Sequence, residues 1–266
     1  YPELKGKTVL EKRADAKTRY DDLRRVLLWE PRGHENMYGA ILVEPDSDDA
    51  DFGVIFIHNE GYSTGCGHAV IALTKVFVEM GFIDKKEQTT EVIIDVPSGL
   101  VRAYAEVKNG RIMGVGFQNV PSFVQLLDEE INVPGLGMIR YDLGFGGAFY
   151  AFVDVDQVGL NCTPKFHSQL TTVGMKIKQA IMDTVEMKHP VELDMNFLYG
   201  IIFTGPAMKK RNHSRNVCVF ADGQVDRSPT GTGVSARAAI HHARGDLNIG
   251  ENIIIESIIG STFGVK

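Results

Sequence analysis

Two segments of this sequence share one layout, in which a glycine-rich turn leads directly into a mostly apolar helical segment. The first turn spans residues 63–68 (STGCGH) and precedes residues 69–80, while the second spans residues 228–233 (SPTGTG) and precedes residues 234–240. A strand pattern comes before each turn. A strand–turn–helix theme that occurs twice predicts two similar halves.

The opening segment carries Tyr20, Leu23 and Leu27 at helical spacing among charged residues. This spacing predicts an amphipathic surface helix that ends near Pro31. After Pro164, apolar residues again recur at helical spacing, which predicts a second amphipathic helix.

Strand patterns dominate residues 38–152, where Asn109-Gly110 is typical of a hairpin turn. Residues 69–80 interrupt them with a run that is apolar nearly all round and is followed by Gly81. We therefore expect this segment to be a helix buried inside a shell of β-sheet. Strand patterns return at residues 197–203 and 216–220.

Composition limits the class of protein. The chain has 266 residues, of which 44% are hydrophobic and 23% charged, as in a soluble globular protein with one large or two medium domains. Its 28 Lys and Arg against 34 Asp and Glu, with no long basic run, argue against a nucleic-acid partner. No apolar run approaches the roughly 20 residues that span a membrane, and the first residues lack a signal-peptide layout. We expect a cytoplasmic protein.

The cysteine pattern favours free thiols. Cys66, Cys162 and Cys218 are an odd number at wide spacing, which argues against a disulfide framework and against a zinc site. Cys162 and Cys218 lie outside the glycine turns and are expected to be packing residues. His241-His242 lacks acidic or thiol partners at ligand spacing, so no metal is expected.

The two turns suit the binding of an anion. A helix N-terminus offers unpaired backbone N–H groups and the positive end of the helix dipole, and glycine allows close approach to the main chain. Two such turns facing one cleft would hold a carboxylate between Cys66 and Thr230. The same field favours a thiolate at Cys66, which can act as a general base. On these grounds alone, Cys66 as a small buried hydrophobe stays an alternative.

Residues 61–68 and 226–233 resemble the two signature segments of the proline racemase superfamily, and residues 29–34 and 146–150 support the resemblance. It implies an α+β fold of the diaminopimelate epimerase type, with two similar domains that each wrap a barrel-like β-sheet around a central α-helix. The active site would lie in the cleft between them. We place the domains at 1–137 and 138–266, with a boundary near Gly135 to Met138.

The resemblance also implies catalysis without a cofactor, a small substrate such as proline or hydroxyproline, and a homodimer. In this family two facing cysteines remove and deliver the α-proton. This chain keeps the first as Cys66 and has Thr230 in place of the second, and threonine does not ionise at accessible pH. The pair resembles the trans-3-hydroxy-L-proline dehydratase branch, in which Cys66 would remove the α-proton and Thr230 would orient the substrate.

Two alternatives stay open. One is a proline racemase or hydroxyproline 2-epimerase that uses Cys66 with a water or another group on the opposite face, and the other is a non-catalytic binder of proline-like amino acids. The resemblance also implies the remaining site residues. Asp226 would pair with the ring nitrogen, Phe220 would form an aromatic wall, and the His68 side chain would contact the hydroxyl or the nitrogen. The substrate carboxylate would be held by the backbone amides of Gly67, His68, Gly231 and Thr232.

The sequence departs from the family pattern in two ways. Gly65 stands where relatives often carry methionine, which would alter the size of the pocket. The family's N-terminal Met-His-Thr-Gly-Gly-Glu segment and its C-terminal strands are not in this sequence. We therefore expect the first domain to lack closing strands.

Overall fold

The computed structural model describes residues 2–266 and divides the chain after Val120 into two compact units, unit 1 and unit 2. The boundary predicted near Gly135 lies instead in the turn between β7 (Phe123–Val133) and β8 (Gly137–Phe145). These strands pair on both sides of that turn, and the Leu136 amide donates to the Val133 carbonyl at 2.9 Å. Pro134-Gly135 thus lies in the turn of a hairpin within unit 2 and does not join two domains.

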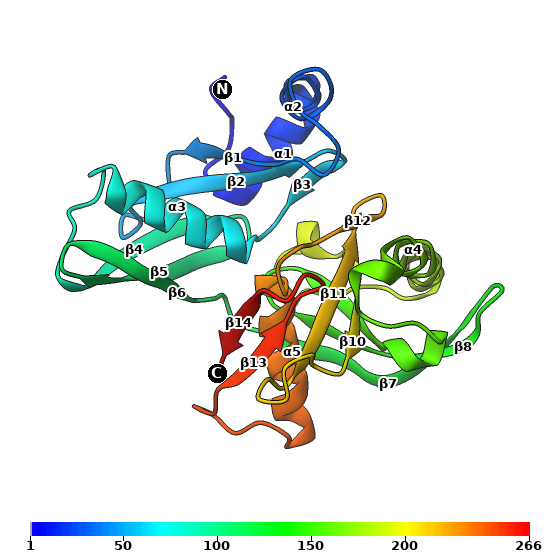
Figure 1. Cartoon of the computed structure of the whole chain (residues 1–266). Coiled ribbons are helices and arrows are strands. Elements are labelled where there is room, and N and C mark those ends of the chain that lie inside the picture. The colour runs from blue at the N-terminus through cyan, green and yellow to red at the C-terminus, as the bar shows by residue number, and fades with distance from the viewer. Residues whose placement is uncertain (1) are drawn as a thin grey trace. The chain divides into compact units, whose positions relative to one another are not determined.

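Unit 1 is a six-stranded mixed sheet with three helices (Figure 1). Its strand order is β1-β2-β4-β5-β6, with β3 paired to β2. The Asn109-Gly110 hairpin predicted from the sequence joins β5 to β6. The elements are α1 (Val9–Arg19), α2 (Asp21–Leu28), α3 (Gly67–Glu79), β1 (Tyr38–Val43), β2 (Phe52–His58), β3 (Gly61–Ser63), β4 (Gln88–Val96), β5 (Gly99–Lys108) and β6 (Arg111–Gln118).

The opening helix is two helices, because the chain breaks at Tyr20. The second ends at Leu28, before Pro31 as expected. The apolar residues that predicted the amphipathic helix do not mark its buried face in α2, where Leu23 and Leu27 are 38% and 44% exposed. Arg24 is buried instead and donates to the carbonyl of His58 at 2.9 Å. Leu23 and Leu27 are four residues apart and share one face of α2, but that face is exposed to solvent.

Helix α3 lies along β4, β5 and β6 (Figure 1). Only Gly67, Val70, Thr74 and Val78 are buried, whereas Val76 is 44% exposed and Met80, just after the helix, 66%. The expectation of a helix enclosed by its sheet is therefore not met in unit 1. The apolar residues run all round α3, but the described strands cover one side of it.

Unit 2 is an eight-stranded mixed sheet in the order β14-β13-β11-β10-β9-β8-β7, with β12 paired to β11. Helix α5 contacts β8 and β9 and also both edge strands, β7 and β14, so the sheet curves around it. Beyond β7 and β8, the elements are β9 (Phe149–Asp154), β10 (Leu198–Gly205), β11 (Ser214–Phe220), β12 (Gln224–Val225), β13 (Ile253–Glu256), β14 (Thr262–Val265), α4 (His167–Thr184), α5 (Gly231–Arg244) and the short 3-10 helices Val155–Val158, Pro164–Phe166 and Leu193–Met195.

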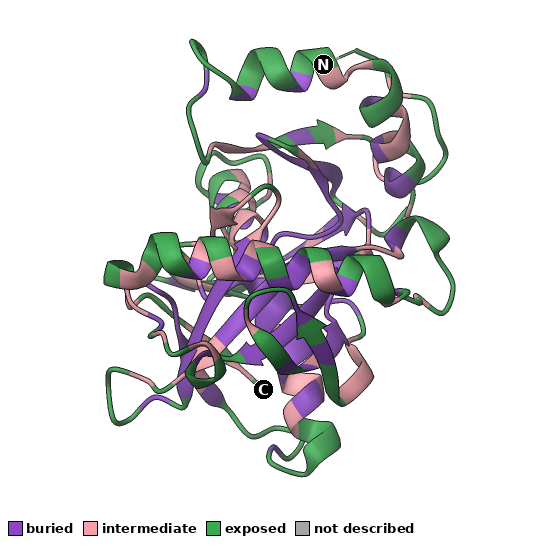
Figure 2. Cartoon of the chain, turned by 90° about the vertical axis from the view of Figure 1, so that its right-hand side faces the viewer, coloured by how far each residue is buried: buried purple, intermediate pink, exposed green. Residues whose placement is uncertain are grey.

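The core of unit 2 lies between its sheet and α5. Tyr150, Ile202 and Cys218 are fully buried there against Ala236 and Ile240 of the helix. The amphipathic helix expected after Pro164 is α4, which buries Leu170, Ile177 and Ile181 on one face. Figure 2 shows the result, with mostly buried strands and helices that expose their outer faces. Among residues 2–266, no helix is both long and apolar enough to cross a membrane.

A buried ion pair joins β13 to β11. The Arg215 guanidinium donates to a Glu256 carboxylate oxygen at 2.8 Å, and both side chains are 1% exposed. Burial raises the pKa of Glu256, but donors from Met208, Lys209, Asn212 and Arg215 outweigh it and hold that pKa at about 2. The ionised pair is therefore part of the folded state at neutral pH.

Glu256→Gln should lower the free energy of unfolding by about 3 kcal/mol, because it leaves Arg215 buried without its counter-charge. Urea titration at pH 7 measures the change, and exposed Glu251→Gln should stay within about 0.5 kcal/mol of the parent. Because the folded pKa is depressed, the stabilisation by Glu256 is present above 4.5 and disappears as the pH falls toward about 2. Equal losses in the two variants would contradict the role of the pair.

Candidate active site

Cys66 is the residue immediately before α3, with an extended backbone (φ −152°, ψ 102°). The helix begins at Gly67, earlier than the expected Ala69, so Gly67 and His68 belong to its first turn. Backbone N–H groups of a first turn have no acceptor within the helix. Cys66 is 7% exposed. The first motif therefore places a nearly buried thiol beside the amide donors of a helix N-terminus.

The turn before Cys66 is held by its own hydroxyl groups and by a neighbouring loop. The Ser63 hydroxyl donates to the Gly65 carbonyl at 2.7 Å and accepts from the Gly65 amide at 3.3 Å. The Ser98 amide donates to the Thr64 carbonyl at 3.1 Å. Ser63 and Thr64 are fully buried. These contacts fix the path of the chain into Cys66.

Tyr38 contacts two histidines near the first motif, His58 and His68. Its ring lies 5.5 Å from the His68 ring in an edge arrangement and 6.0 Å from the His58 ring in a stacked one. His58 is 5% exposed, and its Nδ1 accepts from the Glu60 amide at 3.3 Å. Tyr38 is a positioning residue that the sequence pattern did not single out, because it lies on β1, far from the motif along the chain.

The second motif holds Thr230 in an unusual backbone conformation, with φ 69° and ψ 97°. A positive φ is strained for a β-branched residue and costs about 1–3 kcal/mol. The Thr230 amide donates to the Ser228 hydroxyl at 3.0 Å, and the Thr230 hydroxyl donates to Asp226 at 3.0 Å. Asp226 also accepts from the Ser228 amide at 2.7 Å. These three hydrogen bonds hold the strained turn in place.

Two buried residues behind this turn extend its support. The Asn216 side-chain amide donates to the Pro229 carbonyl at 3.2 Å and accepts from Arg237 at 2.7 Å. Asn216 is fully buried. Sequence reasoning missed both residues, although a polar residue at the start of the otherwise apolar strand at 216–220 was a visible signal. The Thr230 turn is thus tied to β11 and to the middle of α5.

Helix α5 begins at Gly231, so Gly231 and Thr232 lie in its first turn. The Thr232 hydroxyl is 2.7 Å from the hydroxyl of Tyr150, which is fully buried. Burial raises the pKa of Tyr150 well above its ordinary value, so its phenol is neutral. Phe220 at the end of β11 stacks on Tyr199, with ring centroids 5.4 Å apart. The predicted residues of the second motif therefore share one end of unit 2.

The three cysteines differ in what they can do. Burial raises the pKa of the Cys162 thiol to about 12 and that of Cys218 further, so both are neutral thiols in the core. Cys218 lies beside Thr230, which is among the groups that lower its pKa. Cys66 alone stands at the start of a helix. Among residues 2–266, no three His, Cys, Asp or Glu side chains gather as metal ligands would.

The chain belongs to the proline racemase family, whose model matches residues 1–266. Among its relatives, the trans-3-hydroxy-L-proline dehydratase of Colwellia psychrerythraea is 50% identical over 266 residues, which cover all of this chain and 75% of the relative. The trans-3-hydroxy-L-proline dehydratase of Bacillus cereus is 45% identical over 262 residues, or 98% of this chain and 78% of the relative. The family resemblance seen in the motifs is confirmed.

Solved structures confirm the fold at the level of the family. A hydroxyproline epimerase from Agrobacterium vitis, crystallised with trans-4-hydroxy-L-proline, matches with a TM-score of 0.94 at 33% identity. The match covers 99% of this chain and 77% of that protein. The fold is therefore the α+β fold of the proline racemase family, built on two mixed sheets with few helices.

Gly146 should be essential to the start of α5, because a Cβ there would lie 2.2 Å from the Thr232 carbonyl oxygen and 2.6 Å from the Ala236 nitrogen. Both are backbone atoms that cannot rotate away. We expect Gly146→Ala to lower the free energy of unfolding by about 2–3 kcal/mol, as measured by urea titration. Gly116→Ala, where nothing lies within 4 Å of the added carbon, is the matched control. Similar values for the two variants would show that α5 tolerates displacement at this point.

Proposed function

We propose that this protein is a hydro-lyase that dehydrates trans-3-hydroxy-L-proline to Δ1-pyrroline-2-carboxylate without a cofactor, with Cys66 as its acid–base residue. The observation that carries the proposal is that Cys66 and Thr230 each stand immediately before a helix that begins with glycine. The names of the relatives that are 50% and 45% identical support the same reaction.

One acid–base group is enough for this chemistry. In trans-3-hydroxy-L-proline the hydroxyl lies opposite the carboxylate and hence on the same ring face as the α-hydrogen. The Cys66 thiolate would remove the α-proton, and the resulting thiol would then protonate the departing hydroxyl, which leaves as water. The unsaturated ring tautomerises to Δ1-pyrroline-2-carboxylate. Cys66 returns to the thiolate, so protons balance over the cycle.

Thr230 would orient the substrate rather than exchange protons. Its hydroxyl donates to Asp226, and threonine has no accessible ionised form. A second base on the opposite face would therefore be missing. This difference favours dehydration over the two-base exchange by which a racemase or epimerase inverts the α-carbon.

The substrate carboxylate would be held by backbone amides of the two motifs, those of Gly67 and His68 in α3 and of Gly231 and Thr232 in α5. Helix N-termini supply both the donors and a favourable dipole for such a group. Asp226 would pair with the ring nitrogen while it holds Thr230. Phe220, fixed by its stack on Tyr199, would form an apolar wall. His68 would contact the hydroxyl or the nitrogen.

A hydroxyproline 2-epimerase is the second candidate, because the matching Agrobacterium vitis structure is that of a hydroxyproline epimerase. Incubation with trans-3-hydroxy-L-proline, trans-4-hydroxy-L-proline and L-proline separates the two functions. Formation of Δ1-pyrroline-2-carboxylate and optical rotation are measured together. We expect this product from trans-3-hydroxy-L-proline alone. A change in rotation without dehydration would establish the epimerase instead.

Cys66→Ser should lower turnover of trans-3-hydroxy-L-proline by at least about 1000-fold, because an alcohol is a far weaker acid–base group than a thiol at neutral pH. Calorimetric titration of the variant with the same amino acid should still show binding, since the amide donors are unchanged. Full turnover by the variant would exclude Cys66 as the base. Binding without any turnover in the parent protein would identify a non-catalytic binder.

Thr230→Cys should introduce exchange of the α-hydrogen with inversion, because a second thiol is added where the family's second base stands. The readout is deuterium incorporation into trans-4-hydroxy-L-proline in D2O, with its 2-epimer resolved by chromatography. Thr230→Ser keeps the hydroxyl and is the control, for which no epimer is expected. Epimer formation by Thr230→Ser or by the parent would show that a water or another group already serves as the second base.

A homodimer and a cytoplasmic location stay predictions of the sequence. Sedimentation of the purified chain tests the first. Fractionation of the source cells tests the second.

A further inference from the structure

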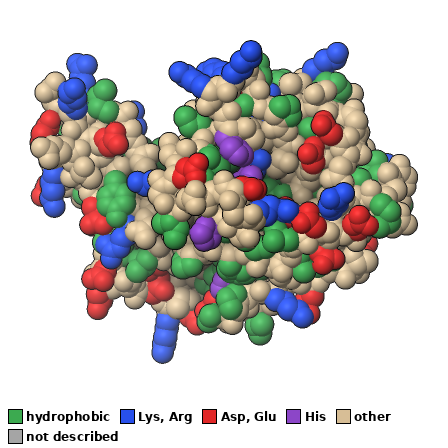
Figure 3. Space-filling model, turned by 90° about the horizontal axis from the view of Figure 1, so that it is seen from below, with side chains coloured by type: hydrophobic (Ala, Val, Ile, Leu, Met, Phe, Trp, Pro, Cys, Tyr) green, Lys and Arg blue, Asp and Glu red, His purple; other side chains and the backbone are tan. Residues whose placement is uncertain are grey.

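Unit 2 contains a cavity of about 460 Å³ at the end of α5 remote from Thr230. Its lining comes from β7, β8, β9, β10, the 3-10 helix Val155–Val158 and α5 from Arg237 onward. Charged side chains of both signs line it, and apolar Phe152 and Ile240 lie among them. Figure 3 shows basic and acidic side chains intermingled on one face of the molecule. A polar cavity of this size has room for a small organic molecule.

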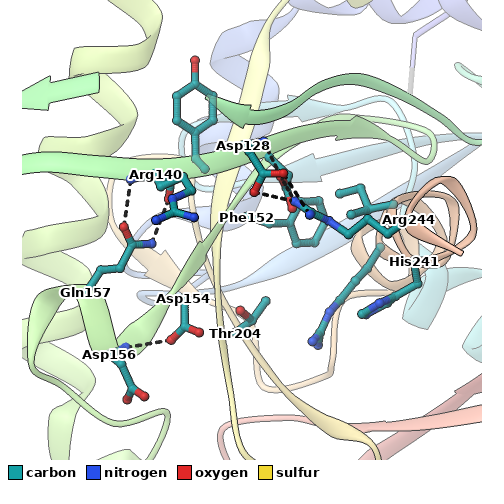
Figure 4. Close-up of a pocket in the computed structure, with 13 residues that line it drawn as sticks. Asp128, Arg140, Phe152, Asp154, Asp156, Gln157, Thr204, His241 and Arg244 are labelled. Atoms are coloured by element: carbon teal, nitrogen blue, oxygen red, sulfur yellow. Dashed lines mark hydrogen bonds and ion pairs between the residues drawn. The ribbon is translucent and has the colours of Figure 1, made fainter. Parts of the chain in front are cut away.

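One group of charges in the cavity is satisfied internally. Arg244 donates to both oxygens of Asp128 at 2.9 Å and to Asp142 at 2.7 Å. Figure 4 shows the Arg244 side chain reaching to Asp128. These carboxylates raise the pKa of Arg244 and keep it charged. This cluster is complete and does not need a ligand.

Arg237 is different, because it is buried without a counter-ion. Its side chain is 8% exposed, and its one hydrogen bond among residues 2–266 goes to the neutral amide oxygen of Asn216. No carboxylate of those residues lies within 4 Å of its guanidinium. Burial lowers its pKa to about 10, which leaves it charged at pH 7. A buried guanidinium with donors to spare favours a carboxylate ligand.

The side of the cavity away from His241 and Arg244 carries two carboxylates, Asp154 and Asp156, together with the Arg140 guanidinium (Figure 4). Asp154 and Asp156 line it without an ion pair among residues 2–266, and Asp154 accepts only from the Asp156 amide at 2.9 Å. Asp154 is close enough to Arg237 to act on its pKa, yet beyond ion-pair distance. Figure 4 draws Asp154 and Thr204 on one side and His241 and Arg244 on the other. Burial lowers the pKa of His241, so its ring lines the cavity as an uncharged group at pH 7.

We propose that this cavity binds a small zwitterion whose carboxylate and ammonium groups are separated by a short carbon chain. The carboxylate would pair with Arg237 and the ammonium with Asp154, so that both unpaired charges gain a partner. A simple anion would be repelled by the aspartates, and a simple amine by Arg237. The carbon chain would lie along Phe152 and Ile240. The proposal does not rest on the dehydratase proposal, because neither Cys66 nor Thr230 lines the cavity.

Calorimetric titration of the whole chain with 4-aminobutanoate tests the proposal. We expect saturable binding, and we expect butyrate and n-butylamine, which each carry one of the two charges, to bind at least about tenfold more weakly. Asp154→Asn keeps the cap on Asp156 and should weaken 4-aminobutanoate by roughly three- to tenfold. Asp183→Asn on α4 is the matched control and should bind as the parent does.

Arg237→Met should weaken 4-aminobutanoate by about tenfold or more, and thermal unfolding shows whether that variant is folded. If it is not, Asp154→Asn decides the matter. Cys66→Ser should bind 4-aminobutanoate as the parent does, which separates this site from the proposed catalytic one. The proposal is overturned if 4-aminobutanoate does not saturate, if the one-charge analogues bind equally well, or if Asp154→Asn has no effect.

Discussion

The left-handed backbone of Thr230 is the constraint on which the second half of the candidate site depends. A β-branched residue does not adopt a positive φ unless its surroundings over-determine it. Here Asp226 holds both the Thr230 hydroxyl and the Ser228 amide, and Asn216 holds the Pro229 carbonyl from below. The strain has a local structural consequence. It allows α5 to begin at Gly231, directly after Thr230, where the first amides of the helix have no acceptor within it.

The same network joins the start of α5 to its middle. Arg237 donates to Asn216, which supports the Thr230 turn, while its guanidinium also lines the charged cavity of unit 2. A buried arginine bonded only to a neutral amide destabilises the fold, because its charge has lost water without gaining a counter-charge. Arg237 would offset this cost by two roles, as support for the Thr230 turn and as a ligand for a carboxylate in the cavity.

The two units carry the same local motif, but their sheets cover the helix that follows it to different extents. In unit 2, both edge strands of the sheet contact α5, and Tyr150 supports its first turn from the core. In unit 1, α3 rests on three strands, and apolar residues such as Val76 stay exposed. Cys66 is nevertheless held in place, because Ser63 and Ser98 fix its turn from the preceding strand and a neighbouring loop.

What the sequence determined by itself is local. The paired glycine turns, Cys66 and Thr230 ahead of their helices, the Asn109-Gly110 hairpin and the family were all readable, because turn chemistry and helix starts depend on residues that are neighbours in the chain. Only the tertiary structure decided that Tyr20 divides the first helix, that a Pro-Gly turn lies inside unit 2, and that α3 is covered on one side. It also supplied Tyr38, Asn216 and Arg237. Their roles arise from contacts between distant segments, and no local pattern encodes which face of a helix a sheet will cover.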